Sequence, residues 1–158
     1  HNEMYNPQGE PLSAATRLPI EENSFDIICL FSVFTHLAPH DYVAMLQMLR
    51  RYVKPQGKII FSLFVNETTK GGRGYIDDID KLWRSRPEKL DSFKEVFEKG
   101  LEKAGPPDFI DYDRSQPLRW AIYSREHALR LVNGTGSEVE SLNGPEEAMQ
   151  HYMVCKPV

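Results

Sequence analysis

Apolar and polar residues are grouped along the first half of this chain in blocks whose lengths are typical of strands and amphipathic helices. Residues 25–31 form a nearly continuous apolar run after the polar turn 21–24, which predicts a parallel strand covered by helices on both faces. Pro39 and Asp41 favour the start of a helix. Apolar residues then recur at helical spacing and predict one buried face, made of Tyr42, Val43, Met45, Leu46, Leu49, Tyr52 and Val53.

The tripeptide Pro55-Gln56-Gly57 predicts the end of this helix and a tight reversal into the next strand. Proline fixes φ and glycine tolerates positive φ, so both suit a sharp turn. An apolar run over 58–65 predicts that next strand. Strand, helix and strand follow one another within about 40 residues, the size of a right-handed crossover with parallel strands. Residues 11–16 are a weaker candidate for a short strand.

The pattern changes after residue 66, where a loop rich in Gly and basic residues covers 68–74. Two helices are predicted, a short one over 77–86 and an amphipathic one over 92–104. A last helix over 125–132 is expected to be capped by Ser124 and ended by Asn133-Gly134. Short strands are predicted over 138–142 and 150–155, and the brief connection between them favours antiparallel pairing. The order of elements is that of an α/β protein.

The chain has 158 residues, of which 41% are hydrophobic, so it can form the core of one domain. Its formal net charge of −4 argues against non-specific binding of nucleic acid. No apolar run approaches the roughly 18 residues of a membrane span, and no signal pattern opens the chain. Since it begins His1-Asn2-Glu3 rather than with Met, a processed or trimmed protein is expected.

The two cysteines, Cys29 and Cys155, both lie in apolar, strand-like runs. They are interpreted as reduced core thiols of a cytoplasmic protein. Metal binding needs more ligands at closer spacing than the chain offers, so no metal site is expected.

Three motifs in the first 65 residues resemble the small-molecule class I S-adenosylmethionine (SAM)-dependent methyltransferases. They are Leu-Pro-Ile-Glu-Glu-Asn-Ser-Phe-Asp over 18–26, Ser-Val-Phe-Thr-His-Leu over 32–37, and Leu-Arg-Arg-Tyr-Val-Lys-Pro-Gln-Gly-Lys over 49–58. The resemblance covers residues 11–65 well and 118–158 loosely. It implies a partial Rossmann-like methyltransferase sheet, with parallel strands, an antiparallel last pair and helices on the faces. In the family's strand order, 3-2-1-4-5-7-6, residues 25–31 and 58–65 would be strands four and five.

The chain departs from this family at the segment that grips the cofactor. The Gly-rich loop after strand one and the acidic residue after strand two are absent, and Gly71 to Gly74 follow strand five instead. Ala14 stands where the family has an acidic residue. Residues 1–158 are therefore interpreted as one truncated methyltransferase domain, in which 66–123 form an inserted cap on the substrate side.

The resemblance implies that SAM is the cofactor and assigns residues to it. Phe31, Ser32 and Val33 would flank its methionine part, and the backbone of Ala14 and Ala15 would reach its adenine. His36 is the candidate catalytic base, because imidazoles exchange protons near neutral pH. The alternative for His36 is packing or capping at a helix start.

A small-molecule methyl acceptor is expected next to the cofactor. Tyr42, Tyr75, Trp120 and Tyr123 are the candidate substrate-binding residues, and aromatic residues of this kind suit an apolar lid. Trp83 could join them, and Asp77, Asp78 and Arg119 could orient a polar acceptor. Ordinary packing is the alternative for these aromatic residues.

Three functions remain open from the sequence. The first is a small-molecule methyltransferase, of which this fragment alone is expected to be inactive. The second is a non-catalytic binding or assembly domain of methyltransferase descent, which the missing Gly-rich loop favours. The third, a nicotinamide dehydrogenase, has the same kind of sheet but not the Phe-Thr-His-Leu motif or an antiparallel last pair.

Strand four is expected to carry an open edge, because strands one and two have no counterpart in the chain. Phe25 should anchor the buried face of this strand. The apolar residues that flank the unpaired edge are Ile27, Ile28, Leu30 and Phe31. Open apolar edges pair with other chains. A homo-oligomer that buries the edge is therefore expected first, with weak or no cofactor binding by the fragment. The alternatives are that residues upstream of this chain cover the edge or that residues 1–20 fold back onto it.

Overall fold

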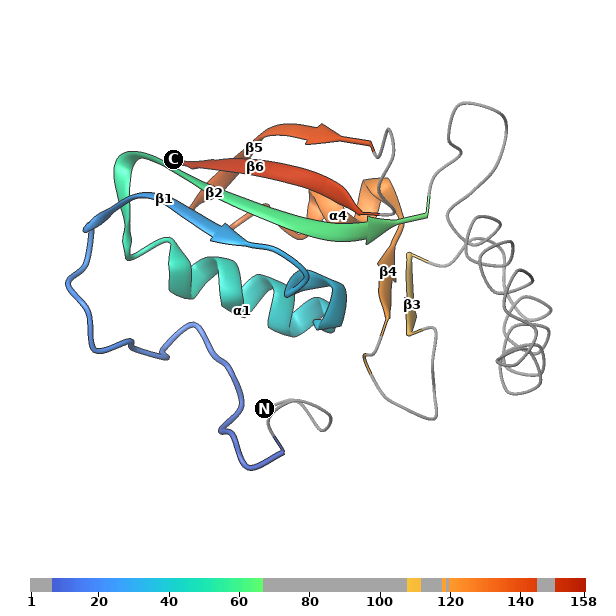
Figure 1. Cartoon of the computed structure of the whole chain (residues 1–158), viewed down its shortest axis with the longest axis horizontal. Coiled ribbons are helices and arrows are strands. Elements are labelled where there is room, and N and C mark those ends of the chain that lie inside the picture. Colours follow the sequence, from blue (N-terminus) through green and yellow to red (C-terminus); the bar gives the residue numbers. More distant parts are fainter. Residues whose placement is uncertain (1–6, 67–107, 112–117, 119, 145–149) are drawn as a thin grey trace, which may run out of the picture.

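The computed structural model describes residues 7–66, 108–111, 118, 120–144 and 150–158 (Figure 1). The predicted helices over 77–86 and 92–104, and the loop over 68–74, lie outside these residues. The described elements are β1 (Phe25–Leu30), a short 3₁₀ helix η1 (Phe34–His36), α1 (Pro39–Leu49), β2 (Val53–Val65), β3 (Phe109–Asp111), β4 (Ala121–Tyr123), α4 (Arg125–Arg130), β5 (Ser137–Asn143) and β6 (His151–Pro157).

The described strands form one mixed sheet with β2 at its centre (Figure 1). β1 runs parallel to β2, whereas β6 pairs antiparallel with β2 and β5 pairs antiparallel with β6. The order β1-β2-β6-β5 reproduces the predicted 4-5-7-6 order, so the Rossmann-like methyltransferase fold is confirmed. Two short strands were not predicted: β4 pairs with Phe64 and Val65 at the end of β2, and β3 pairs with β4.

Helix α1 begins as predicted but ends earlier. Pro39 occupies the first turn and Asp41 lies near the positive end of the helix dipole. The helix stops at Leu49, so the prediction that Tyr52 and Val53 extend its face is wrong. Both residues are nevertheless buried. Tyr52 lies in the turn between α1 and β2, and Val53 is the first residue of β2.

The tripeptide Pro55-Gln56-Gly57 is part of β2, and the predicted reversal at this point is wrong. Phe25 pairs with Val53 whereas Ile27 pairs with Lys58, so the extra residues of β2 are accommodated in an irregularity of the pairing. Gly57 has no positive φ. A Cβ there would lie 2.6 Å from the carbonyl oxygen of Asp26. Glycine is required because the two backbones approach closely.

One face of the sheet carries the hydrophobic core and is covered by α1 and α4. Ile59, Phe61 and Leu63 of β2 are fully buried on this face. The hydroxyl of Tyr42 on α1 donates to the carbonyl of Ala128 on α4 at 3.1 Å. The two helices therefore pack against each other on the same side of the sheet.

The opposite face of the sheet, here called the second face, is more exposed. It carries Ile27, Cys29, Ile60, Ser62, Phe64, Tyr152 and Val154, as the strand pairing and the alternation of side chains require. Phe25 and Ile27 at the start of β1 are 40% and 56% exposed. The prediction of a buried strand anchored by Phe25 is therefore wrong for these residues. Within the described residues, only the side of β1 that faces α1 is packed, through Ile28 and Leu30.

Residues 11–16 form no strand, contrary to the prediction. The hydroxyl of Thr16 accepts from the backbone of Ser13, and the Thr16 N–H donates to the Ser13 carbonyl at 3.0 Å. These local hydrogen bonds close a turn, and short polar side chains favour such turns over sheet pairing.

The C-terminal part agrees with the predicted elements. Ser124 caps α4 by accepting from the backbone of His127, and Gly134 after the helix has φ +77°. β5 and β6 form the antiparallel pair. β2 lies between the strands that carry Cys29 and Cys155, and both thiols are free, as expected from the strand order. Cys155 is buried but Cys29 is exposed, so the prediction of a core thiol is wrong for Cys29.

Candidate functional site

A pocket of about 420 Å³ lies on the second face where β1 and β2 end and β6 begins. Ligands of open α/β sheets bind beyond the carboxyl ends of the strands, so its position is that of a functional site. The residues that line it are Phe31, Ser32, Ser62, Phe64, Trp120, Gln150 and Tyr152.

Ser32 forms the polar end of this pocket with Ser62 of β2 and with Gln150, which directly precedes β6. Its backbone N–H donates to the hydroxyl of Ser62 on β2 at 2.8 Å. The side-chain amide of Gln150 donates to the Ser32 hydroxyl at 2.9 Å. Ser32 has φ +56°, a left-handed conformation that is costly for residues other than glycine. Such strain concentrates at functional sites, where the surrounding contacts hold it in place.

Four aromatic rings form the walls of the pocket. Phe64 on β2 stacks on Trp120 with ring centroids 5.3 Å apart and an interplanar angle of 19°. Phe31 meets Tyr152 of β6 edge to face at 6.1 Å. Phe31 is 58% exposed, an unusual position for a ring of this size unless it faces a ligand or a partner.

The structure thus brings together three of the residues predicted for the site, Phe31, Ser32 and Trp120. Val33 packs against the core cluster and does not line the pocket. Ala14 and Ala15 do not line it either. The Ala15 carbonyl accepts from Arg17 at 2.9 Å and its N–H donates to the Ser13 hydroxyl at 3.2 Å, so both backbone groups have local partners.

Tyr42 and Tyr123, two of the predicted substrate-binding residues, are fully buried in the core and do not line this pocket. Their hydroxyls donate to the carbonyls of Ala128 and Leu37. Burial raises the pKa of both hydroxyls, assisted by Cys155 at Tyr42 and by Asp41 at Tyr123. Their placement is that of packing residues.

Among the other predicted substrate-side residues, Tyr75, Asp77, Asp78, Trp83 and Arg119 lie outside the described part of the chain.

His36 lies in η1, and its Nδ1 is 3.1 Å from the carbonyl oxygen of Leu118. A carbonyl only accepts, so this contact places the proton on Nδ1, and a neutral ring then has its lone pair on Nε2. Leu118 is the residue two positions before Trp120, and it is itself strained at φ +58°. Its N–H donates to the carboxylate of Asp111 at 3.1 Å. His36 is therefore tied to the pocket wall without lining the pocket.

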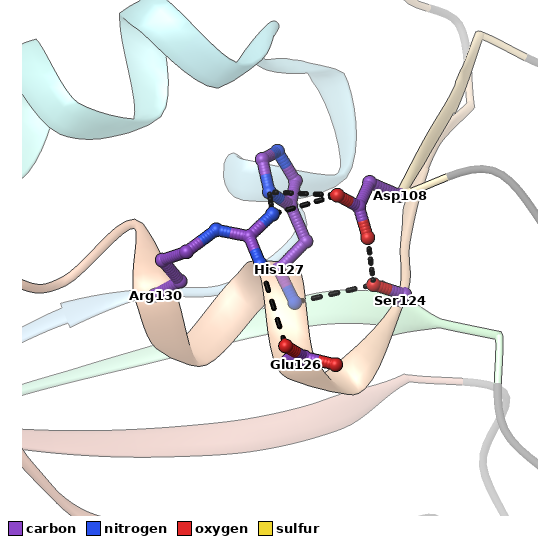
Figure 2. Close-up of polar contacts among 5 residues, drawn as sticks. All are labelled: Asp108, Ser124, Glu126, His127 and Arg130. Atoms are coloured by element: carbon purple, nitrogen blue, oxygen red, sulfur yellow. Dashed lines mark hydrogen bonds and ion pairs between the residues drawn. The ribbon is translucent and has the colours of Figure 1, made fainter.

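A second polar cluster surrounds the start of α4 (Figure 2). It contains a serine, a histidine and an aspartate, but its hydrogen bonds are those of a helix cap. The Ser124 hydroxyl accepts from the backbone of His127 and donates to Asp108, while Arg130 donates to Asp108 at 2.6 Å. Hydrogen bonds from Arg130, then Ser124, lower the pKa of the Asp108 carboxyl. No imidazole nitrogen activates the serine, so the arrangement gives no nucleophile.

Within the described residues, no group of three or more His, Cys, Asp or Glu side chains is arranged to hold a metal ion. None of the described helices combines the length and the apolar character that crossing a bilayer requires.

Sequence reasoning missed Ser62, Phe64, Gln150 and Tyr152. The signal was present in the strand alternation, because Ser62 and Phe64 share one face of β2 and Tyr152 lies opposite Ser62 on β6. The continuous apolar run over 58–65 hid this alternation, since a strand buried on both faces shows no period of two.

The order of the strands and the antiparallel last pair are those of the class I methyltransferase fold. Residues 5–61 match the family described as methyltransferase domain. The predicted resemblance to class I SAM-dependent methyltransferases is confirmed.

Solved structures agree with this fold. CalO1, a methyltransferase in calicheamicin biosynthesis with S-adenosylhomocysteine (SAH) bound, is similar over 87% of this chain and 32% of its own, at 12% identity and a TM-score of 0.53. Mitomycin 7-O-methyltransferase MmcR is similar over 88% of this chain and 31% of its own, at 12% identity and a TM-score of 0.54. LepI in complex with SAM is similar over 94% of this chain and 30% of its own, at 12% identity and a TM-score of 0.53. The chain spans about a third of the length of these proteins.

Proposed function

We propose that this protein is a SAM-dependent methyltransferase that acts on a small-molecule acceptor. The observation that carries the proposal is the pocket at the carboxyl ends of β1 and β2, in a chain with a methyltransferase fold. It combines aromatic walls with a few convergent polar groups, which is the usual composition of a small-molecule site.

The described residues fit one end of SAM. Phe31 and Ser32 follow β1 directly, and an exposed ring beside a hydroxyl suits the sulfonium and methionine end. In the part of the chain that the structure describes, no aspartate or glutamate lines this pocket, so none of these residues is a candidate for binding the ribose hydroxyls. When bound, SAM supplies a methyl group activated by its positively charged sulfur.

The residues of the chain contribute position and a dry environment. Methyl transfer gains most from holding the acceptor atom in line with the carbon–sulfur bond, and the fixed ring of Trp120 and the amide of Gln150 suit that role. The Nε2 of His36 is the proposed acceptor of the proton that a hydroxyl or amine loses.

The test is calorimetric titration of SAH into the protein and into two variants on the same strand. Phe31→Ala removes the ring at the pocket, and Phe25→Ala removes an exposed ring at the other end of β1. We expect Phe31→Ala to weaken SAH binding about tenfold and Phe25→Ala to leave it unchanged. Equal affinities in all three proteins, or no binding of SAH to any of them, contradict the proposal.

The alternative, a non-catalytic assembly domain, is favoured by the exposed apolar side chains of β1. Within the described residues β1 pairs only with β2, and Ile27 is 56% exposed. We propose that β1 also forms a homo-oligomer contact, in a protein located in the cytoplasm. Light scattering should then give a mass above one chain, reduced in Ile27→Lys and unchanged in Gln56→Lys. Assembly without any SAH binding favours the alternative over the enzyme.

A further inference from the structure

Four aromatic rings surround the pocket, those of Phe31, Phe64, Trp120 and Tyr152. Phe64 and Trp120 present nearly parallel planes, while Phe31 and Tyr152 meet at 73°. Flat aromatic molecules pack on such surfaces by stacking or by edge-to-face contacts, each with centroids about 4.5–7 Å apart. A pocket of about 420 Å³ holds a molecule of a few fused rings.

The polar end of the pocket is neutral. It consists of the Ser32 and Ser62 hydroxyls and the amide of Gln150, and among the described residues no lysine, arginine, aspartate or glutamate lines the pocket. A carboxylate or phosphate on the ligand would lose its hydration here without gaining an opposite charge. A hydroxyl both donates and accepts, so it matches the amide and serine groups.

The backbone holds both parts of the pocket in position. Ser32 keeps its left-handed conformation while Ser62 and Gln150 hold its N–H and its hydroxyl. Leu118, also left-handed, is held by Asp111 two positions before Trp120. Two of the three non-glycine residues with positive φ in the described part of the chain thus flank this pocket. Such preorganisation lowers the cost of binding a rigid ligand.

We propose that the acceptor is a neutral, planar, hydroxylated aromatic molecule, stacked on the Trp120 and Phe64 side and hydrogen-bonded to Ser32 and Gln150; this rests on the proposed methyltransferase function. In the transfer, the acceptor oxygen forms a bond to the methyl carbon while the carbon–sulfur bond breaks. The electron pair of that bond stays on sulfur, and the hydroxyl proton passes to a base, for which His36 is the candidate.

The test uses four probes titrated into the protein without cofactor. These are 2-naphthol, naphthalene, the saturated analogue decahydro-2-naphthol and the anion 2-naphthoate. We expect 2-naphthol to bind at least about tenfold more tightly than the saturated analogue, which has no aromatic ring to stack. We expect the same advantage over the anion, whose charge meets no opposite charge among the lining residues. Equal binding of 2-naphthoate or of the saturated analogue overturns the proposal, as does failure of 2-naphthol to bind.

Two variants locate the binding. Gln150→Leu removes the amide at similar size and should weaken 2-naphthol about tenfold while leaving naphthalene unchanged. Trp120→Leu should weaken both, and Phe25→Ala should weaken neither. Circular dichroism confirms that each variant folds, and if Trp120→Leu does not, Tyr152→Leu replaces it. Unchanged 2-naphthol affinity in the folded variants overturns the proposal.

Titration of SAH separates this proposal from the one on which it rests. SAH binding without 2-naphthol binding overturns the acceptor class alone. Binding of 2-naphthol without SAH overturns the methyltransferase proposal and leaves an aromatic-binding pocket.

Discussion

The side-chain amide of Gln150 donates to the hydroxyl of Ser32 across 2.9 Å, although the two residues are 118 positions apart in the chain. This contact joins the segment before β6 to the end of β1. Ser62 on the intervening strand β2 accepts from the Ser32 backbone. The polar end of the pocket therefore exists only when all three strands are in register.

Substitutions at Ser32 separate backbone strain from side-chain function. Glycine adopts φ +56° without the cost that a Cβ brings, so we expect Ser32→Gly to be about 1 kcal/mol more stable than Ser32→Ala. Both variants lose the hydroxyl and should bind 2-naphthol more weakly. Urea denaturation measures the first effect and calorimetry the second. Equal stability of the two variants would mean that the strain at Ser32 is relieved in solution.

Two phenylalanines on neighbouring strands should differ strongly in their contribution to stability. Phe61 is fully buried and stacks on Phe34 at 4.0 Å, so Phe61→Ala should lower the free energy of unfolding by about 3–5 kcal/mol. Phe25 is 40% exposed, so Phe25→Ala should cost less than about 1.5 kcal/mol. A cost at Phe25 equal to that at Phe61 would show that a partner covers the start of β1.

Gly57 should not tolerate a methyl group. The added Cβ would lie 2.6 Å from the Asp26 carbonyl and 2.7 Å from a methyl of Val53. We expect Gly57→Ala to lower the free energy of unfolding by about 1–3 kcal/mol, the usual cost of overpacking. Gln56→Ala at the exposed neighbouring position is the control and should stay within about 0.5 kcal/mol. Similar values for both would contradict the close approach of β1 and β2.

The buried thiol of Cys155 should make the protein less stable at alkaline pH. Burial raises the pKa of this thiol to about 12, whereas an unfolded chain loses the proton near pH 8.5. The contribution of the protonated Cys155 thiol to stability is complete below the pKa of the thiol in the unfolded chain. It is lost as pH rises from there through the pKa of the thiol in the folded protein. We expect the free energy of unfolding to fall from about pH 8.5 upward, by up to about 1.4 kcal/mol per pH unit from this group.

Cys155→Ala removes this contribution and should flatten the dependence above pH 8.5, although its cavity lowers stability at pH 7. Cys29→Ala, at an exposed position of β1, is the matched control. Urea denaturation at several pH values gives the slopes. The same slope in both variants would exclude Cys155 as its source.

Two variants of His36 distinguish a base from a positioning residue. Asparagine can still donate to the Leu118 carbonyl in place of Nδ1, but it cannot take up a proton at neutral pH. If His36 is the base, His36→Asn and His36→Ala should slow methyl transfer equally, by about 100-fold or more, with SAH affinity nearly unchanged. Recovery of activity by asparagine alone would assign His36 to holding the pocket wall. The assay uses the protein in the form that shows transfer, with 2-naphthol as acceptor.

Much of the fold could be predicted because it depends on local rules. The cap at Ser124, the proline start of α1 and the antiparallel last pair follow from short stretches of sequence. β3 and β4 could not be predicted, since each has only three residues and β4 joins the sheet by pairing with β2, which is distant in the chain. The exposure of Phe25 could not be predicted either, because an apolar run in the sequence does not reveal whether a neighbouring layer covers the strand.

The candidate site divides in the same way. Phe31 and Ser32 could be placed from the sequence because they follow directly on a recognisable strand and motif. Tyr42 and Tyr123 are buried in the core. Their placement could not be predicted, because it depends on which face α1 and β4 turn toward the sheet. Gln150 and Tyr152 reach the pocket because β6 runs antiparallel to β2 and brings its first residues to the carboxyl end of β1.

The sequence by itself determined the resemblance to the methyltransferase family and the order of the strands in the sheet, since motifs, caps and apolar periods act over a few residues. The tertiary structure alone decided which side of β2 holds the core and which forms the pocket. It also decided that a glutamine near the end of the chain completes the site of a serine near its beginning. Side-chain alternation places every second residue on the same face, but only packing against α1 and α4 determines which face is buried.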